Sequence, residues 1–282
     1  MLDIKVGYTC NNNCIFCAVK DHEQKDRTFE EFNEIVTKER ANNSNITITG
    51  GEVTIRDDFF KILGRLYELG YDTYIQSNGR MFSNLEFSQI TSFFNISEFL
   101  ISVHGHNKKI HDSLTRTQGS FEQTICGIEN LISLKNKVVT NTVLMKENMN
   151  YIKDLCVLLC SLDVNEILLS YPDITGGSLK NIDKIPTLSE TKEHIPRIVD
   201  VCNKLGIKVI FDNIPLCIMD KYSDYASKKN PINLCLLDTK IDGFLPNIII
   251  DKCKQCELVD ICCHSQQVYV DKFGDKEFKV IL

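Results

Sequence analysis

The sequence lacks three features: an excess of positive charge, a long apolar run and a secretion signal. Its 32 Lys and Arg are outnumbered by 38 Asp and Glu, and the net charge of −6 favours neither a nucleic acid nor an anionic membrane as partner. Neither the start, MLDIKVGYTC, nor any later segment resembles a signal peptide or a membrane span of about 18 apolar residues. We therefore expect a cytoplasmic globular protein that binds neither nucleic acid nor membrane.

Cysteine, by contrast, is abundant, with 13 in a chain of 282 residues. Without a secretion signal we do not expect a disulfide framework, because the cytosol keeps thiols reduced. Three cysteines lie at the front of the chain and six lie in its last quarter. The four between them lie among apolar residues in helical patterns, and we interpret them as small buried hydrophobes. These four are Cys126, Cys156, Cys160 and Cys202.

The front cysteines form the pattern C-x3-C-x2-C, with Cys10, Cys14 and Cys17 in one short segment. Three thiolates hold three irons of a [4Fe–4S] cube and leave the fourth iron open to a ligand other than protein. The C-x2-C-x2-C run of electron-carrying ferredoxins closes every iron and differs in spacing. A zinc site with a fourth ligand from elsewhere is the alternative. Zinc knuckles mostly use C-x2-C or C-x4-C pairs and rarely have an aromatic residue, here Phe16, before the third thiol.

Short β-rich runs alternate with helical patterns over the first two hundred residues, which predicts repeated βα units and a parallel sheet. The expected strands are Leu2–Gly7, Ile46–Thr49, Asp72–Gln76, Phe99–Val103, Val138–Leu144 and Glu166–Ser170. The expected helices are Thr28–Ala41, Asp57–Leu69, Leu85–Phe94, Ser120–Leu134 and Asn150–Ser161. Thr28 followed by Glu31 predicts a capping box for the first helix. Six such units suit an α/β partial (β/α)6 TIM-like barrel, open on one side, and an open doubly wound sheet is the alternative.

The pattern changes after residue 170. Ile174–Ser178 is predicted to be a flexible connection, Leu188–Leu205 a helix and Lys208–Phe211 a strand. From Asn213 onward the periodicity fades, so we expect a barrel over residues 1–213 and a small cysteine-rich domain over residues 214–282. A tail of about 70 residues has little core of its own, and a metal site is a reasonable way to hold it.

Polar residues follow several of the expected strands, at the carboxyl ends where parallel α/β folds bind ligands. Strand two is followed by Gly50, Gly51 and Glu52, where two glycines permit close approach of the backbone to a ligand and the glutamate can accept from an ammonium group. Strand three is followed by a Ser77-Asn78-Gly79 turn. Strand four ends at Ser102 and leads into a His-Gly-His segment.

With these motifs the chain resembles the radical S-adenosylmethionine enzymes over residues 2–213. The resembling motifs are the cysteine pattern with its aromatic Phe16, the Gly-Gly-Glu, the Ser77-Asn78-Gly79 turn and the serine at the end of strand four. The resemblance implies that Cys10, Cys14 and Cys17 hold a [4Fe–4S] cluster. It also implies that the other motif residues hold S-adenosylmethionine, with Glu52 accepting from its amino group. The cofactor-binding set is therefore Phe16, Gly50, Gly51, Glu52, Ser77, Asn78 and Ser102.

The tail carries a second pattern, C-x2-C-x5-C, formed by Cys253, Cys256 and Cys262. Cys217 supplies a fourth thiol, and Cys235 is a possible replacement for it. A zinc ribbon is the alternative, because a four-thiolate site suits both metals. The tail resembles the twitch domain, the short relative of the SPASM extension, and this implies one auxiliary [4Fe–4S] cluster. Cys263 directly follows a ligand and is interpreted as a bystander.

Three histidines and an arginine follow strand four, in the stretch HGHNKKIHDSLTR. One interpretation places His104, His106, His111 or Arg116 in contact with the substrate or the carboxylate of S-adenosylmethionine. The other is a network at the start of a helix that joins His111, Asp112 and Arg116. We assign no catalytic acid or base from this pattern.

The resemblance implies an enzyme that cleaves S-adenosylmethionine reductively and abstracts hydrogen from a substrate carbon with the resulting 5′-deoxyadenosyl radical. Many enzymes with such tails mature ribosomally made peptides through thioether or carbon–carbon links, and we expect this activity. Dehydrogenation of a sugar, alcohol or nucleoside is the alternative, and a non-catalytic iron–sulfur or zinc protein is a third. The expected partners are a peptide or small-molecule substrate and an electron donor such as flavodoxin or ferredoxin. Because no peptide-recognition domain precedes Cys10, we expect any leader peptide to be recognised by a separate protein or by the barrel itself.

Overall fold

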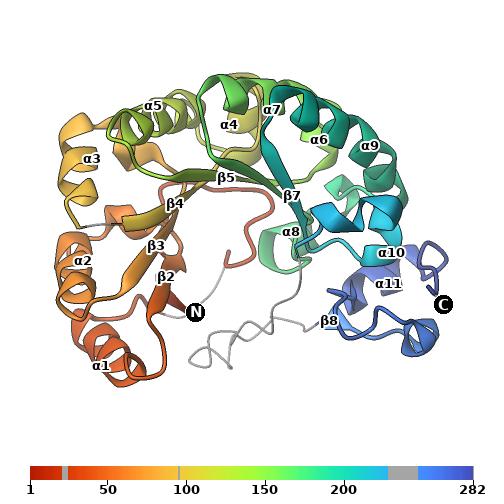
Figure 1. Ribbon diagram of the computed structural model, residues 1–282, viewed down its shortest axis with the longest axis horizontal. Coiled ribbons are helices and arrows are strands. Elements are labelled where there is room, and N and C mark those ends of the chain that lie inside the picture. Colours follow the sequence, from red (N-terminus) through yellow and green to blue (C-terminus); the bar gives the residue numbers. More distant parts are fainter. Residues whose placement is uncertain (21–24, 95, 228–246, 282) are drawn as a thin grey trace.

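The computed structural model describes residues 1–20, 25–94, 96–227 and 247–281. Seven parallel strands form one sheet in chain order, with β1 and β7 at its two edges. The sheet curves into part of a barrel (Figure 1). The strands are β1 (Leu2–Gly7), β2 (Asn45–Gly50), β3 (Asp72–Ser77), β4 (Ile96–Ser102), β5 (Val138–Val143), β6 (Glu166–Ser170) and β7 (Lys208–Asp212). The predicted α/β partial barrel is therefore confirmed, and the strand predicted after the six units, at Lys208–Phe211, joins the same sheet as β7.

Most helices lie on the convex side of the sheet (Figure 1). The long ones are α1 (Phe29–Glu39), α2 (Phe59–Glu68), α3 (Leu85–Ser92), α4 (Lys108–Thr115), α5 (Ser120–Ser133), α7 (Ile152–Ser161) and α9 (Leu188–Leu205). The short ones are α6 (Lys146–Met149), α8 (Gly176–Lys180) and α10 (Leu216–Met219), with the 3₁₀ turns η1 (Val53–Ile55), η2 (Arg80–Ser83), η3 (Ile182–Lys184) and η4 (Asp220–Tyr225). The predicted capping box of α1 is present at Thr28 and Glu31.

Side chains in much of the sheet alternate between buried and half-buried positions, as the period of a strand requires, although Val138, Val139 and Thr140 of β5 are all buried. Ile48, Ile75 and Ile101 belong to the fully buried face that packs against the helices. The neighbouring positions Gln76 and Asn141 are half-buried and lie on the concave side. The helices thus complete the apolar core, while the opposite, concave face is mixed, because half-buried Leu100 and Leu168 lie in register with Gln76 and Asn141.

The tail packs against one end of this barrel. Its described part contains the antiparallel pair β8 (Asn247–Ile248) and β9 (Ser265–Gln266), the turn η5 (Asp251–Gln255) and the helix α11 (Gln267–Phe273). The backbone N–H of Leu188 donates to the Tyr269 hydroxyl at 2.8 Å, and Gln266 Nε2 donates to the Pro172 carbonyl at 2.9 Å. Tyr269 and Phe278 join the same apolar cluster as the barrel. The boundary near residue 213 stays a prediction.

One expectation about the fold was wrong. The Ile174–Ser178 connection was expected to be flexible because it contains two adjacent glycines, but Gly176 starts the helix α8. Gly177 and Ser178 are buried there. The physical reason is that these small residues pack against the cysteine loop, where a larger residue would not fit.

Gly127 of α5 lies close to the turn that follows β3. A substitution of this glycine tests whether the fold needs that close approach. A Cβ on Gly127 would lie 2.2 Å from the carbonyl oxygen of Gly79. We expect Gly127→Ala to destabilise the fold by about 1–3 kcal/mol, because the helix and the turn must separate. The measurement is the urea midpoint of unfolding.

Gly64→Ala is the matched control, since Gly64 also lies inside a helix. Its added Cβ would have as nearest neighbour a Phe94 ring carbon at 3.9 Å, which is ordinary contact. Helix propensity then favours alanine by about 1 kcal/mol. A Gly127→Ala midpoint equal to that of the wild type would contradict the close approach.

Candidate functional site

The three front cysteines lie together in the loop that follows β1. None of the three forms a disulfide. Burial raises the pKa of the Cys14 thiol, and the neighbouring thiols of Cys17 and Cys10 raise it further. The pKa of Cys10 is likewise raised, first by burial and then by Glu52 and Cys17. The structure thus brings the three predicted thiols close to one another and close to Glu52.

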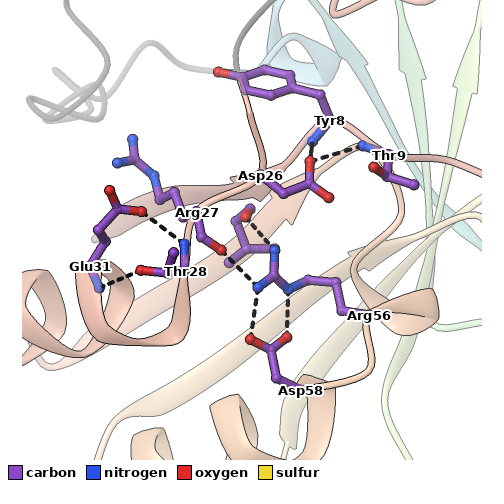
Figure 2. Close-up of polar contacts among 9 residues, drawn as sticks. Tyr8, Thr9, Asp26, Arg27, Thr28, Glu31, Arg56 and Asp58 are labelled. Carbon is purple, nitrogen blue, oxygen red and sulfur yellow. Dashed lines mark hydrogen bonds and ion pairs between the residues drawn. The ribbon is translucent and has the colours of Figure 1, made fainter.

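The entry to this loop is held by two charged side chains. Asp26 Oδ1 accepts from the backbone N–H of Tyr8 at 2.6 Å and of Thr9 at 3.2 Å (Figure 2). Arg56 donates to the carbonyls of Val6 at 2.7 Å and Arg27 at 2.9 Å. Burial alone would raise the pKa of Asp26, but the hydrogen bonds from Tyr8 and Thr9, with Arg56 nearby, keep it below its usual value. The chain therefore leaves β1 along a fixed path.

The end of α4 holds the middle of the loop. The backbone N–H of Asn13 donates to the Thr115 carbonyl, and that of Ile15 donates to the Leu114 carbonyl, both at 2.9 Å. These carbonyls belong to the last turn of a helix, which lacks intrahelical partners. The Phe16 ring meets the His104 ring edge-on, with 4.5 Å between the ring centroids. The aromatic position in the cysteine pattern is thus a packing contact with the end of β4.

The helix α8 holds the other side of the loop. The backbone N–H of Gly177 donates to the Cys17 carbonyl at 2.8 Å, and Ser178 Oγ donates to the Phe16 carbonyl at 2.9 Å. Asn181 Nδ2 donates to the Ile15 carbonyl at 3.0 Å. The sequence analysis missed these residues, and only the adjacent glycines could have signalled a close approach.

Gly50 and Gly51 lie against the exit of β1. A Cβ on Gly50, whose φ is 135°, would lie 2.2 Å from the Gly7 carbonyl oxygen, and one on Gly51 would lie 2.2 Å from that of Thr9. The backbone N–H of Gly51 donates to the Gly7 carbonyl at 2.8 Å. The close approach that the structure shows is therefore between two segments of the chain. It keeps the cysteine loop next to β2.

Glu52 is buried at the centre of a hydrogen-bond network. Its Oε1 accepts from the Thr54 hydroxyl, from the Thr54 backbone N–H at 3.1 Å and from Ser77 Oγ at 2.8 Å. Its Oε2 accepts from the Asn78 backbone N–H at 2.7 Å. Burial raises the pKa of Glu52, and the hydrogen bonds from Asn78, Thr54 and Ser77 oppose that shift. The network joins the ends of β2 and β3.

The turn after β3 connects this network to the cysteine loop. Asn78 Nδ2 donates to Asn11 Oδ1 at 2.6 Å, and Arg80 donates to the Asn11 carbonyl and, at 3.0 Å, to Asn12 Oδ1. Ser77 and Asn78, both predicted, therefore lie where the sequence analysis expected them to gather. Ser102 ends β4 opposite Asn141, and its side chain takes part in none of these contacts.

The contacts after β4 match the network interpretation only in part. Within the described residues they involve His111 and Asp112, but no hydrogen bond or ion pair joins Arg116 to either of them. The His104 backbone N–H donates to His111 Nδ1 at 3.2 Å, and both rings are buried. Burial lowers the pKa of His104 well below its usual value and lowers that of His111 to about 4. The Asp112 carboxylate accepts from the backbone N–H of Gly119 and Phe121 and from Ser120 Oγ. These groups stabilise the start of α5 and the path of α4.

The tail cysteines form a second group. Cys217, Cys253, Cys256 and Cys262 line one pocket, together with apolar residues such as Phe278. Burial, together with the neighbouring thiols of Cys217, Cys262 and Cys256, raises the pKa of Cys253 to about 11. Cys217 therefore joins the three tail cysteines, as predicted, while Cys235 lies outside the described residues.

Cys263 contributes to this group through a hydrogen bond. A hydrogen bond with the Cys263 thiol lowers the pKa of Cys262 to about 6, and the backbone N–H of Leu216 and of His264, each 3.4 Å from its Sγ, act in the same direction. Cys263 therefore forms a hydrogen bond with Cys262, an interaction that was not predicted from the sequence.

The chemistry of both thiol sets suits an iron–sulfur cluster. In the part of the chain that the structure describes, no three His, Cys, Asp or Glu side chains are close enough to hold one metal ion. The thiolates of a [4Fe–4S] cluster bind different irons and need not meet at a point.

Among the described residues, no helix is long and apolar enough to cross a membrane.

Comparison with known proteins identifies the family. A model described as the Radical SAM superfamily matches residues 4–159. The AdoMet-dependent heme synthase of Oleidesulfovibrio alaskensis is 26% identical over 155 residues, which cover 54% of this chain and 40% of that protein. A probable GTP 3′,8-cyclase of Saccharolobus islandicus is 25% identical over 202 residues, which cover 70% of this chain and 65% of that protein. The chain therefore spans less than two thirds of the length of these relatives.

A solved structure shares the fold. It is SuiB of Streptococcus suis bound to the precursor peptide SuiA, with a TM-score of 0.62 and 17% identity. The match covers 74% of this chain and 47% of SuiB.

The Glu52 network gives a prediction about stability. In Glu52→Gln, one carboxylate oxygen is replaced by an NH2 group, which donates hydrogen bonds. This group would then face the backbone and hydroxyl donors that now bind the carboxylate. We expect the free energy of unfolding to fall by about 1–3 kcal/mol, because a buried donor loses its acceptor. Chemical denaturation would measure this.

Glu31→Gln is the control, since glutamine can also close the capping box of α1. Equal stability of the two variants would show that the Glu52 carboxylate is not needed to join the ends of β2 and β3.

Proposed function

Because the chain belongs to the radical SAM superfamily, whose members use a [4Fe–4S] cluster and S-adenosylmethionine, we propose that it modifies a ribosomally made peptide. The modification is a thioether or carbon–carbon cross-link or a related oxidation. The observation that carries the radical chemistry is that three cysteines without disulfides lie close to one another and to the buried carboxylate network of Glu52. When bound, the cluster and S-adenosylmethionine supply a 5′-deoxyadenosyl radical that abstracts hydrogen from a substrate carbon.

Cys10, Cys14 and Cys17 would hold this cluster. Their loop is fixed by backbone hydrogen bonds on two sides, so the thiols are placed before the cluster binds. Cys10 is the most exposed residue of the three, whereas Cys14 and Cys17 are half-buried. Hydrogen bonds from the surrounding protein to cluster sulfurs set the reduction potential of such centres.

Glu52 would bind the amino group of S-adenosylmethionine through Oε2. That oxygen accepts one hydrogen bond, from the Asn78 backbone N–H, while Oε1 accepts three. A carboxylate has about four lone-pair sites, two on each oxygen, so Oε2 retains acceptor capacity. Ser77, Asn78 and the two glycines before Glu52 position this oxygen. Phe16 acts through its contact with His104.

The half-buried concave side of the sheet, which carries both polar and apolar side chains, would receive the substrate. Ser170 Oγ donates to Asn141 Oδ1, and Thr49 Oγ1 donates to Gln76 Oε1. Paired amides and hydroxyls of this kind suit the backbone groups of a peptide. The fold shared with the peptide complex of SuiB supports the same choice. The electron donor would be a flavodoxin or ferredoxin, and a separate protein would recognise any leader segment.

A small-molecule substrate is the second candidate. The two curated relatives are named for a heme synthase and a probable GTP cyclase, and neither name refers to a peptide. Under this alternative the concave side would hold a sugar, alcohol, nucleoside or similar compound.

We propose a second [4Fe–4S] cluster in the tail, held by Cys217, Cys253, Cys256 and Cys262. The four thiols line one pocket, and the lowered pKa of Cys262 favours its thiolate form. Such a cluster would accept the electron left after hydrogen abstraction or bind the substrate directly.

The central test is the cleavage of S-adenosylmethionine. Anaerobically reconstituted protein with dithionite should form 5′-deoxyadenosine, and Cys14→Ala should lose this activity because one iron lacks its ligand. Cys126→Ala is the matched control, since Cys126 is another half-buried thiol, in α5, whose thiol donates to the Ser83 carbonyl. Liquid chromatography with mass spectrometry measures the product.

If the reconstituted wild type forms no 5′-deoxyadenosine, the proposed chemistry is overturned.

The substrate class is decided by deuterium transfer. A deuterated peptide encoded by a gene next to this one should label 5′-deoxyadenosine, and label from a deuterated sugar or nucleoside alone would favour the second candidate.

Metal analysis tests the tail cluster. We expect about eight irons per chain in the wild type and about four in Cys253→Ala, because two [4Fe–4S] cubes hold four irons each. Cys160→Ala should keep the wild-type iron content, since Cys160 donates to the Leu205 carbonyl away from both groups. Stoichiometric zinc that disappears in Cys253→Ala would replace the tail cluster with a zinc ribbon.

A further inference from the structure

Three consecutive carbonyls of the cysteine loop point to α8 and the residue after it. They belong to Ile15, Phe16 and Cys17, and they accept from Asn181 Nδ2, Ser178 Oγ and the Gly177 backbone N–H. The Ser178 side chain is fully buried, so its hydroxyl is committed to this contact. Each peptide unit of the loop from residue 15 to residue 18 is therefore held at its oxygen.

The glycines of α8 make this contact close. A Cβ on Gly176 would lie 2.7 Å from the carbonyl oxygens of Cys17 and Ala18. A Cβ on Gly177 would lie 2.8 Å from the Ile15 carbonyl oxygen and 3.0 Å from the Cys17 nitrogen. All three distances are shorter than ordinary van der Waals contact. The loop and the helix therefore meet backbone to backbone, with no room for a side chain between them.

Fixed carbonyls also fix the N–H groups of the same peptide units. All peptide bonds of the described chain are trans, and in a trans peptide the C=O and the N–H point in opposite directions. The N–H groups of Phe16 and Ala18 therefore point away from α8. Within the described residues, neither of these two N–H groups donates to a protein acceptor. Backbone N–H groups seldom stay without a partner.

We infer that α8 is a positioning element for the cluster of the front loop, which rests on the proposed function. Gly177, Ser178 and Asn181 hold the loop so that the N–H groups of Phe16 and Ala18 donate to sulfur atoms of the cluster. Such hydrogen bonds stabilise the extra negative charge of the reduced cluster and raise its reduction potential. The residues thus set how readily the cluster accepts an electron.

The experiment compares two α8-side variants with two matched controls. Ser178→Ala removes the bond to the Phe16 carbonyl, and Ser88→Ala removes an equivalent bond from a fully buried hydroxyl to the Phe82 carbonyl. Asn181→Leu removes the bond to the Ile15 carbonyl, and Asn130→Leu removes an amide bond to the Phe82 carbonyl. The reconstituted full chain is used throughout.

Two readouts do not depend on turnover. One is the midpoint reduction potential of the front cluster, followed by electron paramagnetic resonance. The signal of the front cluster is the one that changes when S-adenosylmethionine is added. The other is the rate of iron loss from that cluster to a chelator. We expect both α8-side variants to shift the potential to more negative values and to lose iron roughly tenfold faster, as changes around metal ligands do. Both controls should match the wild type.

Each other outcome decides against the inference. Wild-type potentials in both α8-side variants would overturn it, and so would equal shifts in the controls, which would indicate general loosening. If one α8-side variant fails to fold, the other still gives the comparison. A wild type that binds the front cluster without cleaving S-adenosylmethionine would instead overturn the proposed function and leave this comparison valid.

Discussion

The site depends on the need to give hydrogen-bond partners to a loop that lies outside the sheet. The residues from Cys10 to Cys17 have no strand beside them, yet buried backbone groups require partners. The last carbonyls of α4 accept from one part of the loop, and α8 donates to another. The position of the three thiols is therefore a property of two other βα units, and the loop cannot fix it alone.

Burial and hydrogen bonding compete at Glu52, and the competition explains why the residues around it must be polar. Removing a carboxylate from water costs several kcal/mol unless donors replace the water. Four donors from Thr54, Ser77 and Asn78 do so here. The serine and asparagine after β3 are thus needed to hold the glutamate after β2 even before any ligand binds.

Much of the fold could be predicted because the alternation of apolar and polar residues is local. The predicted β1, β6 and α9 match the structure, and the capping box at Thr28 is present. The helix α8 could not be predicted in the same way, since two glycines favour flexibility unless a partner is known. That partner, the Phe16 carbonyl, lies 162 positions from Ser178. No local pattern contains such a contact, and the same reason hid Asn181.

The separation between the loop and α8 has a consequence for how the protein is made. The cysteine loop is synthesised before α8, and Gly177, Ser178 and Asn181 follow only after β2 to β6 have been synthesised. Until then the loop lacks one of its two supports. Because domains form as their chain emerges, the nascent chain carries the three thiols on an incompletely supported loop until α8 has been synthesised. Cluster insertion into a rigid site is accordingly a late event in the biogenesis of this protein.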